Sequence, residues 1–469
     1  MLSVLRNRTY RHLFGAQVVA LVGTGLATVA LALLAYDLAG ADAGAVLGTA
    51  LAVKMVAYVA IAPVAGALAG RVPPRALLVA ADLTRAGVAL ALPFVTQVWQ
   101  VYLAVLLLQA ASAAFTPTFQ AVIPRVLPAE RDYTHALSMS RLAYDLESLF
   151  SPALAALLLT LVPYGLLFAG TTAGFLASAA LVVSAVLPKA PAADRPAADR
   201  PAADRPGAGR PGADRPGGGH RRAAAGSRLF RATPRLRALL ALDLAVAAAG
   251  AIVFVDTVVV VRAHFHRPAG AVSLALGAYG AGSMLTALAL PRVLARVSDR
   301  AVMLSAALAL PVVLAATAAT TAAAPGTAAW AALLAAWALI GAASSAVLTP
   351  GGRVVRRSAA DADLPAAFAA QFSLSHSCWL LTYPLAGWLA AGAGLPVTAL
   401  VLGALALAAA LGAAALWPRH DPDALPHLHT DLPAGHPHLA EAHPTPAGAW
   451  SHRHRYVIDR DHRRWPQPA

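Results

Sequence analysis

Charged residues and cysteine are both scarce in this sequence, and each scarcity excludes a class of protein. Only 12% of the 469 residues are charged, while 59% are hydrophobic, against about 25% and about 45–50% in an ordinary soluble domain. A chain of this composition cannot shield its apolar surface from water, so we expect its solvent to be a lipid bilayer. The single cysteine, Cys378, excludes an intramolecular disulfide and any zinc or iron–sulfur site built from cysteines.

Several functional motifs are also missing from the sequence. It has no Gly-x-x-x-x-Gly-Lys-Ser/Thr loop, which argues against an ATP-driven pump, and neither His-Glu-x-x-His nor Gly-x-Ser-x-Gly, which argues against a membrane-embedded enzyme. The formal charge of +14 is spread over loops and two polar segments rather than along one helix face, so we expect no nucleic-acid partner. We expect no cofactor and a monomeric protein.

Twelve stretches are long and apolar enough to cross a bilayer as helices, which takes about 20 residues. We expect an all-α membrane protein whose first six spans lie near 13–36, 44–69, 76–96, 99–123, 135–160 and 163–187, and whose last six lie near 237–262, 270–292, 301–320, 327–349, 365–391 and 395–417. The first run follows three arginines and no convincing cleavage site, so we expect it to be a retained helix.

Arginine and lysine indicate the orientation of these spans, because short cytoplasmic loops are enriched in them. Alternate connections carry them, namely Arg6, Arg8, Arg11; Arg71, Arg75; Arg125, Arg131; Lys189 and the arginines after it; Arg292, Arg296, Arg300; and Arg353, Arg356, Arg357. The intervening connections have almost none, with Arg262 and Arg267 as the exceptions. We therefore expect both termini in the cytoplasm and the protein in the plasma (inner) membrane.

Two polar segments divide the chain. A five-residue repeat, PAADR and its variants, runs from Pro191 to Arg215 and has no apolar residue larger than alanine, so it predicts a linker without a core. After Trp417 the chain is rich in proline and histidine. We expect an N-terminal half over 1–188, a linker over 189–227, a C-terminal half over 228–418 and a tail over 419–469, with linker and tail cytoplasmic.

The two halves repeat each other. RVPPRALL from Arg71 corresponds to RVSDRAVM from Arg296, Thr116-Pro117 to Thr349-Pro350, and SMSR from Ser138 to SLSH from Ser373. The spacing between partners is nearly constant. Parallel repeats of this kind face each other across a cavity at the membrane midplane and rock alternately around it.

These features resemble the major facilitator superfamily, and more narrowly its bacterial drug- and metabolite-efflux branch. The signature loop of that superfamily is Gly-x-x-x-Asp-Arg followed by basic residues, and this chain has Gly66-Ala-Leu-Ala-Gly70-Arg71 and then Arg75. Ala81-Asp82-Leu-Thr-Arg85 resembles a motif of this branch in which an acidic–basic pair stabilises cytoplasmic closure. The resemblance implies that Gly66, Arg71, Arg75, Asp82 and Arg85 form the gating loop.

The sequence also departs from the family pattern at several positions. Glycine replaces the usual aspartate at position 70, Thr24 stands where an aspartate is common, and only Pro152 remains of the Gly-Pro-rich bend of antiporters. The arginine in span four that many drug antiporters use for proton coupling has no clear equivalent. The resemblance implies a transporter, whereas its substrate and energy source stay open.

Seven ionisable residues inside the expected spans are candidates for lining the cavity or for coupling, because a charge there costs about 2.5–3.5 kcal/mol on insertion scales and normally faces protein or water. They are Lys54, Arg141, Asp145, Glu147, Asp243, Asp256 and His376. Arg141 and Asp145 share a helix face, whereas Glu147 lies on nearly the opposite side of the helix and is expected to pair with Lys54. Either these pairs are structural, or one carboxylate of this set carries a proton during transport; we expect His376 to be a polar wall of the cavity.

The tail contains three His-x-His pairs, His427/His429, His436/His438 and His452/His454. Alternate residues of an extended segment point the same way, so each pair offers two imidazoles to one Ni²⁺, Co²⁺, Cu²⁺ or Zn²⁺ ion. Similar tails occur on nickel-resistance permeases of the facilitator type. The alternative is a solvated tail without a metal, and the apolar stretch from Tyr456 to Trp465 is expected to dock on the cytoplasmic face.

The sequence thus predicts a secondary active transporter, an antiporter that exports a small molecule by alternating access and is driven by the proton gradient. A divalent metal exporter with a metal-binding tail is the first alternative. A membrane sensor that has lost transport is the second.

Overall fold

The computed structural model describes the two helical halves and part of the tail. The described residues are 2–39, 43–68, 72–188, 218–268, 270–422, 424–429, 432, 436–439, 441–445, 449–458, 462 and 465–466. Gly70, Arg71 and the five-residue repeats lie outside them.

Twelve long helices form two groups of six, as the hydropathy pattern predicts. The first group is α1 (Arg8–Ala39), α2 (Ala43–Leu68), α3 (Pro74–Ala91), α4 (Val98–Val126), α5 (Glu130–Leu159) and α6 (Tyr164–Ser184). The second is α8 (Pro234–Val259), α9 (Gly270–Val293), α10 (Asp299–Ala322), α11 (Thr327–Ser358), α12 (Leu364–Ala393) and α13 (Leu395–Leu416). Short helical turns extend these groups at η1 (Leu2–Arg6), η3 (Leu92–Phe94) and η7 (Val260–His264). The predicted fold class is confirmed.

The twelve helices differ in where they lie in the bundle. Among the described residues, nine helices are long and apolar enough to cross a membrane, and α2, α5 and α12 complete the twelve. These three helices lie at the contact between the halves, where α2 packs against α12 and α5 packs against α9. Asp145 of α5, for example, contacts Ser283 of α9 and so faces protein instead of lipid.

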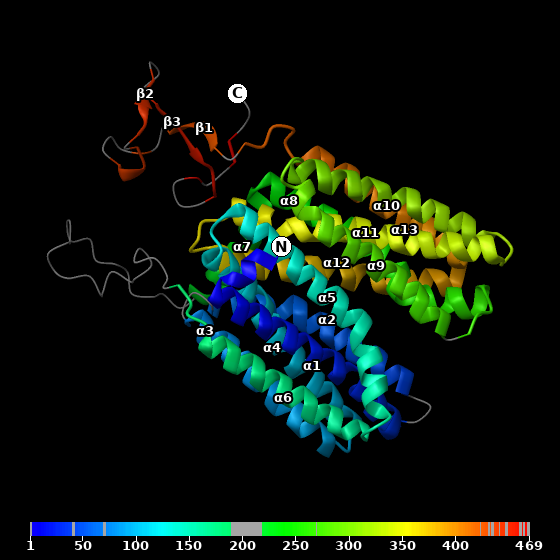
Figure 1. Cartoon of the computed structure of the whole chain (residues 1–469). Coiled ribbons are helices and arrows are strands. Elements are labelled where there is room, and N and C mark those ends of the chain that lie inside the picture. The colour runs from blue at the N-terminus through cyan, green and yellow to red at the C-terminus, as the bar shows by residue number, and fades with distance from the viewer. Residues whose placement is uncertain are drawn as a thin grey trace.

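The halves meet most closely at one end of the bundle. That end carries η1, the end of α4, the start of α5 and the sheet of the tail, and it is called the tail end below (Figure 1). From there the ribbons of the two halves diverge toward the opposite end (Figure 1).

Two helices differ from the predicted boundaries. Residues 218–227 belong to the expected linker, yet α7 (Gly218–Ala232) begins there and packs against α2, α8 and α12. Its alanine-rich sequence favours a helix, and Leu229 and Phe230 are buried in the core of the second half. The other helix, α11, continues nine residues past the predicted end at 349. Its arginines Arg353 and Arg356 contact the first half at the tail end, so this segment stays helical instead of forming a loop.

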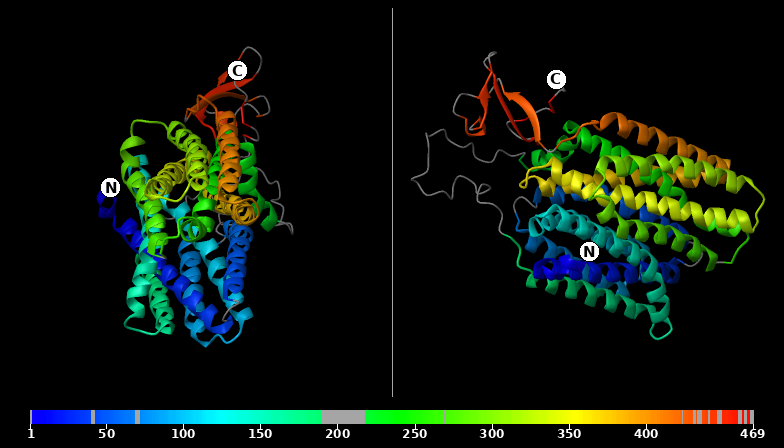
Figure 2. Two further views of the ribbon diagram at one scale, coloured as in Figure 1. Left: turned by 90° about the vertical axis from the view of Figure 1, so that its right-hand side faces the viewer. Right: turned by 45° about the horizontal axis from the view of Figure 1, so that its top comes forward.

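The tail folds instead of remaining a solvated chain. β1 (Ala424–His429) and β3 (Trp450–Arg455) pair antiparallel, and β2 (His443–Pro444) pairs with the other edge of β3. The short helical turn η8 (Pro437–Leu439) lies between β1 and β2 in the chain. Figure 2 shows this small sheet outside the helix bundle, next to the tail end.

Candidate functional site

A cavity of about 460 Å³ lies between the two halves. Helices α2, α4 and α5 of the first half and α8, α9, α11 and α12 of the second contribute to its wall. Its volume is within the range of about 300–1,000 Å³ found for small-molecule sites. The duplicated motifs converge there, because Arg141 and His376, the corresponding residues of SMSR and SLSH, both line the cavity.

Aromatic side chains dominate the cavity wall although aromatic residues make up only 6% of the chain. Seven of them line it: Tyr58, Tyr144, Phe254, Tyr279, Phe368, Phe372 and Trp379. Phe254 contacts both Tyr279 and Trp379 edge to face, with ring centroids 5.2 and 5.9 Å away. Such a wall suits a substrate with an apolar or aromatic body.

One ion pair of the cavity wall contacts the second half through a serine. Arg141 Nη2 lies 2.9 Å from Asp145 Oδ1 on α5, and both side chains contact Ser283 of α9. The Ser283 hydroxyl donates to Asp145 Oδ2 at 2.7 Å and accepts from Arg141 Nε at 3.0 Å. The predicted Arg141–Asp145 pair is present, and its charges compensate each other.

Among the described acidic residues of the cavity wall, Asp243 is the one without an ion pair to a cation. Gln371 Nε2 donates to Asp243 Oδ2 at 2.7 Å, while Asp243 Oδ1 has no hydrogen-bond partner within the part of the chain that is described. The side chain is 3% exposed. An ionised carboxylate without a cation is costly at this depth, which distinguishes Asp243 from Asp145, whose charge is compensated by Arg141.

The other intramembrane charges lie outside the cavity wall. Lys54 and Glu147 attract each other electrostatically, but no ion pair within 4.0 Å joins them among the described residues. The Lys54 ammonium lies 5.6 Å from the ring centre of Tyr58. Asp256 is buried on α8, away from the cavity. Depth along the membrane therefore does not bring all seven residues into one site.

His376 forms part of the cavity wall, as expected. Its Nδ1 lies 2.7 Å from the carbonyl oxygen of Phe372, and its ring stands edge to face against Tyr58. A nitrogen held by a backbone carbonyl is its N–H donor, which fixes the orientation of the ring. The neighbouring Cys378 is buried in the same helix.

Polar contacts close the interface at the tail end. Arg353 of α11 pairs with Glu130 of α5 at 3.1 Å and with Asp299 of α10 at 3.0 Å. Arg356 donates to the carbonyl oxygen of Pro128 at 2.7 Å, and the Tyr133 hydroxyl donates to that of Gly352 at 3.1 Å. The sequence does not identify these residues as an interface, because its arginines fall in an expected loop.

Three residues that the family resemblance assigns to the gating loop, Arg75, Asp82 and Arg85, contact the first half and not the interface between the halves. Asp82 and Arg85 form a buried ion pair, but their surroundings, Ser178, Phe115 and Phe175, all belong to the first half. Arg75 donates to the carbonyl oxygen of Ala185, also in the first half. This pair therefore fastens α3 to α4 and α6 and does not bridge the halves.

Gly66 does reach the second half. A Cβ atom at this position would lie 2.5 Å from the Cβ of Ala369 and 3.4 Å from the carbonyl oxygen of Pro365. Only glycine lets α2 approach α12 this closely at the tail end.

Replacing Gly66 by valine should therefore open the tail end. The added side chain overpacks the α2–α12 contact at a cost of about 1–3 kcal/mol, which is avoided when the halves separate. We expect a thiol placed in the cavity, Ser375→Cys in a Cys378→Ser background, to react faster with an impermeant reagent applied at the tail end. Gly87→Val is the matched control, since a Cβ at Gly87 meets nothing within 4 Å; equal labelling of both variants would contradict the tight contact.

The tail histidines gather in a different way from the predicted pairs. Nitrogens of His427, His438, His452, His454 and His462 all lie within 4.8 Å of one another. This set takes both members of one His-x-His pair and one member of each of the others. His462 was not predicted, because its place depends on the chain folding back over the sheet. His429 and His436 lie outside the set.

The tail also docks on the bundle, as the apolar stretch predicts. Arg455 donates to the carbonyl oxygens of Arg356 and Ala359 at the end of α11. The guanidinium of Arg235 lies 5.1 Å from the ring centre of Trp465 and pairs with Asp421 at 3.2 Å.

Comparison with known families identifies the architecture. The sequence profile of the Major Facilitator Superfamily matches residues 13–261 and again 244–457. The chain belongs to the major facilitator superfamily. Members of this superfamily are multi-pass membrane transporters and not enzymes, so this major facilitator protein is a transporter. Comparison with curated proteins gave no significant match.

Solved structures of other major facilitator proteins share the fold. The human organic anion transporter MFSD10 (TETRAN) superposes with a TM-score of 0.67 at 14% identity, over 87% of this chain and 99% of that one. The E. coli fucose:proton symporter FucP gives 0.64 at 15% identity, over 87% and 98%. The proton:xylose symporter XylE gives 0.63 at 13% identity, over 87% and 95%. At these identities the likeness concerns the fold alone.

Proposed function

We propose that this major facilitator protein is a proton-coupled exporter of a small molecule with an apolar or aromatic body, working by alternating access. The observation that carries the proposal is Asp243, a buried carboxylate that faces an aromatic cavity between the halves and has no cation beside it. A proton bound there neutralises the site, and a proton released there leaves a charge that favours water entry.

The proposed cycle uses the polar contacts of the tail end as one gate. With Arg353 and Arg356 bound to the first half, the cavity is shut on that side. Breaking these contacts would open the cavity at the tail end. Closure of the opposite end would then shut it on the other side of the membrane. The Arg141–Asp145–Ser283 contact joins α5 to α9 at the cavity wall, and we expect the halves to pivot there.

The tail end is proposed to be cytoplasmic and the membrane to be the plasma membrane. The arginines of α11 and Arg125 lie at this end, and cytoplasmic connections carry an excess of such residues. In this orientation the cavity is shut toward the cytoplasm.

Transport into vesicles tests this function. Inside-out membrane vesicles with an acidic interior should accumulate a lipophilic cation or a neutral aromatic probe, and an agent that collapses the pH gradient should abolish the uptake. Trypsin should remove the tail from inside-out vesicles and leave it intact in right-side-out ones. Uptake at the same rate with and without the pH gradient would refute proton coupling.

A divalent-metal exporter is the second candidate, favoured by the histidine cluster of the tail. The cavity wall favours it less, because His376 is the one imidazole among the described residues of the wall and its Nδ1 is bound to a carbonyl oxygen. Gradient-driven uptake of Ni²⁺ or Zn²⁺ in the same vesicles, with no uptake of organic probes, would select this candidate.

A further inference from the structure

The face of the tail sheet that carries the histidines follows from strand register. In β1, residues 425, 427 and 429 point to one side, and in β3 residues 450, 452 and 454 do the same. The antiparallel register sets His427 opposite His452 and Leu425 opposite His454. Four imidazoles thus share one face of a two-stranded ribbon, and three of them, those of His427, His452 and His454, belong to the cluster.

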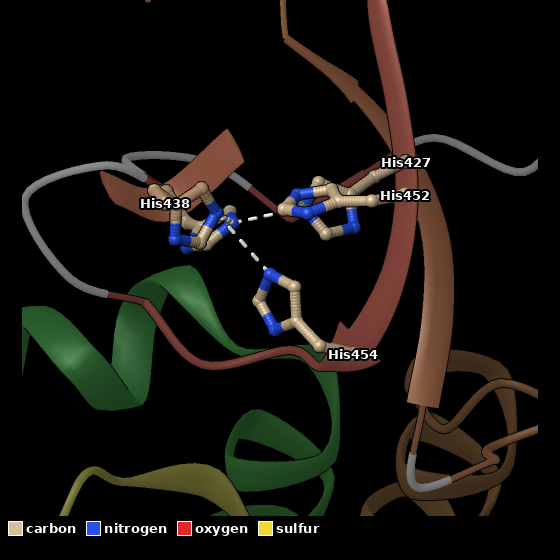
Figure 3. A group of neighbouring side chains, drawn as sticks. His427, His438, His452 and His454 are labelled. Carbon is tan, nitrogen blue, oxygen red and sulfur yellow. Dashed lines mark hydrogen bonds between the residues drawn. The ribbon is translucent and has the colours of Figure 1, made fainter. Parts of the chain in front are cut away.

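Two further imidazoles close over this face. His438 comes from η8, and His462 comes from the segment that follows β3. Figure 3 shows His438 and His454 pointing toward each other and His427 beside His452. The five residues come from four separate segments, although they are spread over 36 positions of a tail that is otherwise rich in proline and arginine.

The nitrogens form a continuous chain of short approaches. Nε2 of His427 lies 3.0 Å from Nε2 of His452 and 2.9 Å from Nε2 of His462. Nε2 of His438 lies 3.1 Å from Nε2 of His462 and 3.2 Å from Nε2 of His454. Two nitrogens bound to one ion at about 2.0–2.1 Å stand about 2.9–3.4 Å apart when they are neighbours in its coordination shell. The observed separations match this range.

Backbone carbonyls fix which nitrogens carry protons. Nδ1 of His427 lies 3.0 Å from the carbonyl oxygen of Leu425, and Nδ1 of His454 lies 2.8 Å from that of Arg455. A carbonyl oxygen only accepts, so Nδ1 is the donor and the lone pair of the neutral ring is on Nε2, which faces the cluster. Metal-binding histidines are held in the same way by their second nitrogen.

The ligand set also indicates which kind of cation the cluster suits. Imidazole nitrogens suit ions such as Zn²⁺, Cu²⁺ and Ni²⁺. No carboxylate belongs to the cluster of described residues, which disfavours Mg²⁺ and Ca²⁺, because these ions require oxygen ligands.

We propose that the tail folds around one divalent transition-metal ion, of the Zn²⁺, Ni²⁺, Co²⁺ or Cu²⁺ type, held by imidazoles of His427, His438, His452, His454 and His462. This site is separate from the transport cavity. Bound metal joins β1, η8, β3 and the segment at His462, and so stabilises the part of the tail that Arg455 attaches to α11. The docked segment lies beside Arg356, one of the residues that close the interface between the halves.

Metal titration of the full-length protein tests the site. The protein is purified through a tag without histidine, stripped with a chelator, desalted and titrated with Co²⁺ by visible absorption and with Zn²⁺ by calorimetry. We expect one equivalent to bind, with cobalt absorption bands typical of nitrogen ligands. His452→Ala/His454→Ala should weaken binding at least about tenfold.

A matched variant separates a built site from general affinity of a histidine-rich tail. His436→Ala/His443→Ala removes the same number of histidines from the same tail but outside the cluster, and should bind like the wild type. A second readout is proteolysis of the tail: Zn²⁺ should slow it in the wild type and in this control, and a chelator should reverse the effect. No binding by the wild type, or equal weakening in both double variants, would overturn the proposal.

Discussion

Replacing Asp82 by asparagine is expected to destabilise the protein by about 3–5 kcal/mol, the cost of leaving a buried arginine without its carboxylate in soluble proteins. Arg85 is 4% exposed, and its guanidinium lies 4.5 Å from the ring centres of both Phe115 and Phe175. The asparagine keeps the shape of Asp82 but removes the charge. Heating the purified protein while recording tryptophan fluorescence should show a much lower melting temperature.

Two further variants distinguish this effect from a general loss of charge. Asp361→Asn makes the same change at an exposed turn and should melt like the wild type. Asp82→Asn combined with Arg85→Met removes both charges and places an apolar side chain between the two rings, so much of the stability should return. A wild-type melting temperature for Asp82→Asn alone would show that the pair does not hold the first half together.

The twelve spans were predictable because each is an apolar run of about 20 residues that ends at charges, glycine or proline. The end of α11 was not, since Arg353 lies one helical turn beyond the apolar run and stays helical only because Glu130 and Asp299 contact it. Likewise α7 begins in a polar segment and is anchored by Leu229 and Phe230. Tertiary contacts determine both of these helix boundaries, and the local sequence pattern does not reveal such contacts.

The depth of the candidate cavity residues in the membrane could be predicted from the sequence. The rotation of each helix about its own axis could not. Helical spacing separates Asp145 from Glu147, and the structure places the first in the cavity wall and the second outside it. Which of the two faces the cavity depends on how α5 is turned against α9, set by contacts such as Ser283 with Asp145. For the same reason, nothing in the sequence favours Asp243 over Asp256 on α8.

The histidine cluster of the tail sheet could also be predicted only in part. Alternation along each strand predicts that His452 and His454 share a face. The register that sets His427 opposite His452, and the return of the chain that brings in His462, are long-range features. The sequence therefore indicated the ligand type but not the ligand set.

Replacing Asp243 by asparagine is expected to abolish transport driven by a pH gradient while leaving exchange of substrate across the membrane intact. The amide keeps the shape and can still bond to Gln371, but it cannot take up a proton. Exchange of labelled for unlabelled substrate needs no net change of protonation and should survive. Inside-out vesicles with an acidic interior, compared with vesicles at equal pH, measure the two activities separately.

Asp256→Asn is the matched control, because it makes the same change on the same helix at a buried carboxylate outside the cavity wall. This variant should keep its response to the pH gradient, and so should Glu147→Gln when combined with Lys54→Met, which removes the opposite charge as well. Loss of both driven transport and exchange in a well-folded Asp243→Asn protein would mean that the carboxylate binds substrate instead of carrying the proton. Full gradient-driven transport by Asp243→Asn, with loss in Asp256→Asn or in the Glu147 variant, would move the proton site to that residue and refute the role proposed for Asp243.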